Sequence, residues 1–368
     1  MPEREMATLN ERIFDRFVRR AHAVERTKAG ITRNAIGTIV NGFMGRLEER
    51  IGGRLTRLKS RGDVVPILKT KGYADLKDLI RTGMQKGFRG MQADLAEHMR
   101  ELALQQSRFT LKVMGEEFAF DFRAQVPALG EFRRMISREP IAGKTLGQWF
   151  TGLARQGTDD TLRDLNVGLR QSETADEILA RLTGRGGAFP RTLRAAETVV
   201  DTSLTHAADG GQRLALEANE EVVEEEQWSS ILDDATCITC SSLDGQTFPL
   251  GEGPRPGEDS HPGCRCRLIP VIKSAKELGL TEEDLPEIER RAMDGDVPER
   301  TTYPEWLKSQ PASVQNEVLG PTRGALFRSG KVPIDRMVDP RLRPLNLKDL
   351  AKREGIEIPR RGNGKRSS

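Results

Sequence analysis

All four cysteines of this 368-residue chain lie in one short stretch, residues 237–266. A Cys-x2-Cys pair can hold one metal ion with two thiolates, and a second pair that arrives through a loop can complete a tetrahedron. The second pair here is Cys-x-Cys. In an extended chain residues i and i+2 face the same way, so both later sulfurs can reach the same ion. The pattern predicts a zinc site formed by Cys237, Cys240, Cys264 and Cys266, with His261 as a fifth candidate ligand.

Two other arrangements of the same thiols remain open, namely a pair of disulfides or four reduced and buried cysteines. Residues 3–5 are all charged and no apolar segment follows them, so we expect no secretory signal. A reducing cytosol disfavours disulfides. On that ground zinc is the expected cofactor, and disulfides are the alternative.

The low aromatic content favours long, solvated helices over a β-sandwich. Aromatic residues make up 5% of the chain, and charged residues make up 31%. A sandwich core would need more Tyr, Trp and Phe. The net charge of +3 permits contact with nucleic acid without arguing for it. No apolar run approaches the roughly 18 residues of a membrane span. We therefore expect a mainly α protein with a small antiparallel sheet, an α+β fold, stapled by the Cys/His cluster.

Apolar residues recur at helical spacing through most of the first 226 positions. We expect an N-terminal helical region over residues 1–138 and a second helical region over residues 139–226, which ends in a long helix. Gly210 and Gly211 mark a candidate break in that helix. Phenylalanines alternate with other residues at 118–122, which predicts a short extended segment.

The period of the pattern changes to two after the long helix, which predicts strands. Residues 227–232, 246–250 and 267–272 are the three strands expected in a small Cys-rich β core over residues 227–275. Three short strands bury little apolar surface, so a metal or disulfide staple at their turns would offset that weakness. The glutamates of residues 217–226 are expected to form a solvated face rather than an acid–base group.

The rest of the chain divides into a C-terminal region of helical and extended pieces, residues 276–345, and a basic tail, residues 346–368. Residues 281–284 and 303–308 are the expected starts of helices in the C-terminal region. The end of the tail is basic and lacks apolar residues, so we expect the tail to be disordered and able to contact phosphate or an acidic surface.

Several short segments, taken in order, resemble the minor head proteins of tailed bacteriophages, the head morphogenesis family that includes the F protein of phage Mu. The Cys block is the specific part of the resemblance, which covers roughly residues 140–345. Residues 1–135 carry no family motif. The segments are Ala196-Glu197-Thr198, Asp201-Thr202-Ser203, Trp228, Leu232-Asp233, Thr236-Cys237, Cys240, Leu243-Asp244-Gly245, His261-Pro262, Cys264-Arg265-Cys266, residues 303–307 and residues 319–323.

The resemblance implies a structural protein and not an enzyme. Members of the family are present in few copies per virion and associate with the portal and the capsid interior. They assist head morphogenesis and genome packaging or delivery. The implied partners are the portal protein, a major capsid or scaffolding protein and possibly DNA, with no membrane involved. The implied location is the virion, and the host cytoplasm during assembly.

Two other functions compete with that reading. A treble-clef-like metal-dependent nuclease acting on DNA also combines Cys-x2-Cys with a later His-Pro-Gly-Cys segment, but it needs a general-base histidine beside an open metal position. His261 is the only histidine near the cysteines. A DNA-binding protein could instead use basic residues in the first sixty positions and in the tail.

Overall fold

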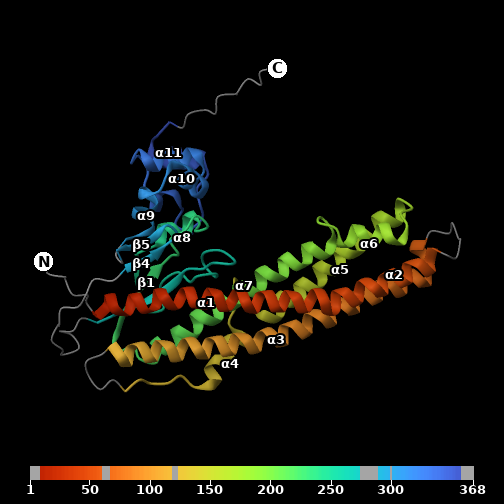
Figure 1. Ribbon diagram of the computed structural model, residues 1–368, viewed down its shortest axis with the longest axis horizontal. Coiled ribbons are helices and arrows are strands. Elements are labelled where there is room, and N and C mark those ends of the chain that lie inside the picture. Colours follow the sequence, from red (N-terminus) through yellow and green to blue (C-terminus); the bar gives the residue numbers. More distant parts are fainter. Residues whose placement is uncertain (1–8, 60–66, 118–122, 274–288, 299–300, 358–368) are drawn as a thin grey trace.

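The computed structural model describes residues 9–59, 67–117, 123–273, 289–298 and 301–357. Figure 1 shows a long bundle of helices, with a small sheet and a group of short helices at one end of it. This arrangement confirms the expected fold class, a mainly helical protein with a small antiparallel sheet. The extended segment predicted at 118–122 and the helix start predicted at 281–284 lie outside the described residues.

The N-terminal part of the bundle is a pair of long antiparallel helical rods. The first rod is nearly continuous, since a five-residue π-helix joins its two α-helices, and the second is a single helix of 47 residues. The ring of Phe43 lies so close over Gly87 that an added Cβ would be 2.3 Å from a ring carbon. Glycine therefore sets the spacing of the two rods. The elements are α1 Leu9–Ile39, η1 Val40–Met44, α2 Gly45–Lys59, the short 3-10 helix η2 Ile67–Lys69 and α3 Lys71–Glu117.

The second part of the bundle adds four helices, of which α7 packs most extensively on α3. Thr145 and Thr174 cap the first turns of α5 and α6 with side-chain oxygens, as capping boxes do. Because α3, α5 and α7 share one apolar core, the two helical regions expected from the sequence form a single bundle. The helices are α4 Leu129–Arg138, α5 Leu146–Arg170, α6 Ala175–Thr183 and α7 Ala188–Glu217.

The predicted break at Gly210 and Gly211 is wrong, because α7 runs through both residues. An added Cβ at Gly211 would lie 2.2 Å from the carbonyl oxygen of Ala103 on α3. At Gly210 it would lie 2.1 Å from the sulfur of Met135 on α4. The glycines therefore permit close contact between helices, which outweighs their low helix propensity.

The sheet has three antiparallel strands in the order β2-β1-β3, with β1 in the centre. The three predicted strands are present, although β1 begins four residues earlier than expected. Glu226 lies on β1 with only 3% of its surface exposed, so the acidic run is not wholly the solvated face that the sequence suggested. The strand alternation turns this glutamate inward, where it accepts a hydrogen bond from Gly251 N. The strands are β1 Val223–Ser229, β2 Thr247–Pro249 and β3 Arg267–Ile272.

A second, smaller core lies beyond the sheet, where short C-terminal helices pack around Tyr303 and Trp306. The disorder expected over residues 346–368 needs correction as far as residue 357, because a capped helix follows Asn346 and buries Leu350 completely in this core, and residues 358–368 lie outside the described residues. The elements are α8 Ile238–Leu243, β4 Glu289–Ala292, β5 Gly295–Pro298, α9 Tyr303–Ser309, α10 Ala312–Leu319, α11 Pro321–Arg328, η3 Ile334–Met337 and α12 Leu347–Glu354. Among the described residues, no helix has the length and apolar character to cross a bilayer.

Candidate metal centre

The first two cysteines lie at the start of α8. Cys237 is the N-cap residue, and its Sγ accepts a hydrogen bond from the backbone N of Cys240 at 3.5 Å. A side-chain acceptor at this position satisfies a helix N–H that has no partner within the helix. The Cys-x2-Cys spacing therefore does two things at once: it begins the helix and places both sulfurs on the same side of its first turn.

The other three candidate ligands come from the turn that leads into β3. Gly263 has a φ of +72°, a conformation that a side chain would disfavour, and it reverses the chain between His261 and Cys264. Its backbone N donates a hydrogen bond to Thr202 Oγ1 on α7 at 3.0 Å. Cys266 follows immediately before β3 and is buried. The turn thus presents the imidazole and two thiols to α8.

The structure brings all five predicted ligands together, with Cys240 in the middle. Its Sγ lies 3.3 Å from His261 Nε2 and 3.6 Å from Cys264 Sγ. Two triads have their ligand atoms within 4.8 Å of one another: Cys240 with Cys237 and His261, and Cys240 with Cys264 and Cys266. All four cysteines are free, and 3.6 Å is far beyond the roughly 2.05 Å of an S–S bond. This cluster could therefore hold a metal ion.

The clustered thiols compete for protons. Hydrogen bonding from Cys240 lowers the pKa of Cys237 to about 4, and it also places the pKa of Cys264 well below its usual range. Hydrogen bonds with Cys237 and Cys264 raise the pKa of His261 to about 11. Burial raises the pKa of Cys266. The lowered pKa values of Cys237 and Cys264 favour thiolate charge within a largely buried site, and a bound cation would stabilise that charge.

Polar groups behind the cluster fix the segments that carry the ligands. Arg265 forms a bidentate pair with Asp233, with both N–O distances at 2.7 Å. Ser230 Oγ accepts a hydrogen bond from Trp228 Nε1 and donates one to the Cys240 carbonyl at 2.9 Å. The Arg265–Asp233 pair joins the Cys-x-Cys segment to the turn before α8. The hydrogen bonds of Ser230 join α8 to the end of the central strand β1. Such outer contacts hold metal ligands in position.

The metal loop, which is the turn that carries the candidate ligands His261, Cys264 and Cys266, is also fastened to the helical bundle through a buried lysine. Lys28 on α1 is fully buried, and its Nζ donates to Thr205 Oγ1 at 2.7 Å. Thr205 in turn donates to the carbonyl oxygen of Cys264 at 3.1 Å. Glu25 and Asp201 compensate the lysine charge at 3.0 Å and 3.4 Å. The ammonium group of Lys28 thus joins α1, α7 and the metal loop. The sequence alone does not identify this role of Lys28.

Arg267 completes this charge network from the sheet side. Its guanidinium lies 2.5 Å from Glu25 Oε1 and donates to the carbonyl oxygen of Cys266 at 2.8 Å. Burial lowers the pKa of Lys28, with Arg267 adding to the effect. A buried charge that is paired and hydrogen-bonded in this way requires all its partners in place. The metal loop and the N-terminal rod are therefore ordered together.

Comparisons with known proteins add no relatives to this description. No family model matches the chain, and neither the curated proteins nor the solved structures include a match.

Proposed function

We propose that the Cys/His cluster is a structural zinc site. Zinc prefers four ligands in a tetrahedron, and thiolate and imidazole donors suit it. The chain supplies five candidate donors in two triads that share Cys240, so it offers enough protein ligands for a four-coordinate ion without water or substrate. Three of the four thiols are buried, which suits a closed site. The side of the small sheet that faces the cysteines has a core of few apolar side chains, and the metal would stabilise that side.

Metal analysis of the purified chain tests this assignment. We expect about one zinc per chain, and replacement by Co²⁺ should give the visible absorption bands of a tetrahedral thiolate site. Mutation of Cys240 should abolish both signals. A protein that takes up no divalent metal at neutral pH and tolerates a strong chelator would contradict the proposal.

We further propose that the chain is a structural minor head protein of a tailed bacteriophage, present in few copies and associated with the portal and the capsid interior. The observation that carries the proposal is a contact between two separate parts of the resemblance. Thr202, from the Asp201-Thr202-Ser203 segment of α7, accepts from Gly263 in the His-Pro-Gly-Cys turn. Segments far apart in the sequence thus build one unit that joins a stapled sheet to a long bundle.

The nuclease alternative gains no support from the geometry. A metal-dependent nuclease needs a histidine free to act as general base beside an open coordination position. Nε2 of His261 instead lies 3.3 Å from Cys240 Sγ, inside the ligand cluster, and Nδ1 lies 2.9 Å from the carbonyl oxygen of Pro262. Both ring nitrogens are thus engaged, as in a structural ligand with a second contact that orients the ring.

Fractionation of phage particles tests the assembly role. In cells that produce the phage encoding this chain, it should sediment with portal-containing heads, at a stoichiometry far below that of the major capsid protein. Deleting its gene should leave heads that are malformed or that deliver DNA poorly. Normal, fully infectious particles without the protein would overturn the assignment, and so would cleavage of plasmid DNA that His261→Ala abolishes.

A further inference from the structure

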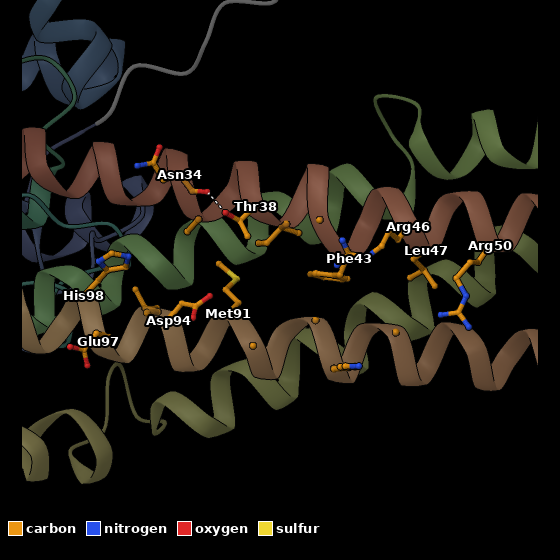
Figure 2. Close-up of a pocket in the computed structure, with 18 residues that line it drawn as sticks. Asn34, Thr38, Phe43, Arg46, Leu47, Arg50, Met91, Asp94, Glu97 and His98 are labelled. Carbon is orange, nitrogen blue, oxygen red and sulfur yellow. Dashed lines mark hydrogen bonds between the residues drawn. The ribbon is translucent and has the colours of Figure 1, made fainter.

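A groove runs along the outer part of the bundle, between the first rod and α3. Its volume is about 650 Å³, and it extends on α3 from Gly83 to His98. A helix rises about 1.5 Å per residue, so this length is about 22 Å, or four turns. Figure 2 shows Phe43, Leu47 and Met91 between the two rods, where they form the apolar floor.

Two glycines leave the walls of this groove open. An added Cβ at Gly90 on α3 would meet no heavy atom within 4 Å, and at Gly42 on η1 it would meet only an Arg46 nitrogen at 4.0 Å. Gly83 and Gly87, in contrast, are covered by Leu47 and Phe43 from the first rod. The first two glycines are therefore not needed for packing within the chain. They leave room for another backbone to approach.

The charges of the groove are separated along its length. Arg46, Arg50 and Lys86 line one end, and Asp94 and Glu97 line the other, as the labelled side chains in Figure 2 show for all but the lysine. Within the described part of the chain, no ion pair engages the three cations or Asp94. Among the residues that the structure describes, the ion-pair partner of Glu97 is Arg100 on its own helix. The two ends thus offer opposite charges to a ligand.

We propose that this groove binds one amphipathic α-helix of a partner protein, about four turns long, with an apolar stripe in its middle, acidic residues at one end and basic residues at the other. The apolar floor and the two helical walls fit a third helix packed along a helix pair. A second copy of the groove is equally concave and could not fill it. The separated charges fix the direction in which the helix lies. This inference does not depend on the proposed function, because the groove contains none of the metal ligands.

Fluorescence anisotropy with the full chain and two labelled peptides tests this inference. Both peptides have about 16 residues and one composition, Leu, Ala, Glu and Lys, with side-chain staples that keep them helical. One carries Glu at one end and Lys at the other, and the control distributes the same charges evenly. We expect the first peptide to bind at least about tenfold more tightly than the second. On binding it should protect residues 34–50 and 83–98 from hydrogen exchange.

Variants of the groove separate this binding from non-specific adhesion. Gly90→Met fills the groove and should abolish binding. Gly115→Met is the matched control, because Gly115 lies on the same helix, also meets no atom within 4 Å, and is outside the groove. Reversing the charge of the basic end with Arg46→Glu and Arg50→Glu should lower the affinity for the first peptide at least about tenfold. The same variant should bind a peptide with Lys at both ends more tightly.

Three results would overturn the proposal. The first is equal binding of both peptides, and the second is no binding at concentrations up to about 1 mM. The third is self-association of the unmodified chain, measured by light scattering, that Gly90→Met abolishes and Gly115→Met does not. That result would assign the groove to a second copy. Circular dichroism of each variant confirms that the helices remain folded, so loss of binding reports on the groove.

Discussion

The helical bundle and the Cys-rich module achieve order in different ways. The bundle places large apolar side chains along rods of several turns, and its core extends through α3, α5 and α7. The module has three short strands and a core in which three buried thiols stand beside Trp228, Leu243 and Leu268. Long helices bury enough apolar surface to fold by themselves, whereas a small sheet needs a cross-link. The difference predicts that, if the cluster holds the proposed metal ion, its removal should disorder the module and the contacts fastened to it, and leave the shared core of α3, α5 and α7 largely intact.

The largest effect should come from the central ligand. Cys240→Ser removes the sulfur shared by both triads, so we expect zinc loss and unfolding of the module, a cost of several kcal/mol. Hydrogen exchange should become fast over residues 223–272 and remain slow over α3 and α5. Chelation of the unmutated protein should give the same pattern. If the whole bundle unfolds with the module, the contrast between the two regions is wrong.

The next largest effect should come from the lysine that joins the regions. Lys28→Met leaves Asp201 and part of the Glu25 charge without a partner, so we expect a loss of about 3 kcal/mol in the free energy of unfolding. Zinc affinity should fall about tenfold, because the loop loses its fastening through Thr205. Urea unfolding and competition with a chelating dye measure the two effects.

The matched control for this variant is Lys112→Met on α3. Its side chain is 67% exposed and pairs with Glu116 at the surface, so we expect a change within about 0.5 kcal/mol and unchanged zinc affinity. If Lys28→Met behaves like this control, the buried network does not couple the loop to the bundle.

A third prediction concerns the pH dependence of the sheet. Burial raises the pKa of Glu226 from 4.5 to about 7, with the charge of Asp209 adding to the shift. The folded state therefore binds this proton more tightly than the unfolded chain, and stability falls as the pH rises from about 4.5 to 7. Glu226→Gln should remove that loss and stabilise the protein by about 2 kcal/mol above pH 7. Urea unfolding across this range, compared between the two proteins, measures it; equal slopes would contradict the prediction.

The smallest effect should be confined to the bundle. Gly152 lies within α5, and an added Cβ there would meet no atom within 4 Å. Gly152→Ala should raise the free energy of unfolding by about 1 kcal/mol, because alanine restricts the unfolded chain and favours a helix. Zinc affinity should not change. Thermal unfolding measures the gain, and Gly211→Ala, which would collide with the backbone of α3, should instead destabilise the protein.

The sequence revealed the Cys/His cluster because thiols carry their chemistry in their identity and spacing. Cys237, Cys240, Cys264, Cys266 and His261 could be selected from the sequence, and the structure brings all five together. Their position at a helix cap and a glycine turn follows from local rules. The three strands likewise follow from a local period of two, although the first begins earlier than the pattern indicated.

Features that depend on distant contacts could not be found in this way. Lys28 lies in an ordinary polar stretch, and only the approach of α7 and the Cys264 carbonyl explains its burial. Gly211 has the local signature of a helix break, but the close approach of Ala103 determines its role. Leu350 lies in a mostly polar tail, and the core around Trp306 that buries it is formed mainly by other segments.

The double role of Cys237 makes the module sensitive to oxidants. Its sulfur both caps α8 and belongs to the ligand cluster, and it is the one cysteine of the four that is partly exposed. Conversion to a sulfinic acid would remove one candidate metal ligand and alter the helix cap in a single chemical event, without a reductant that readily restores it. If the cluster holds the proposed zinc ion, peroxide should therefore release the ion and destabilise the small sheet.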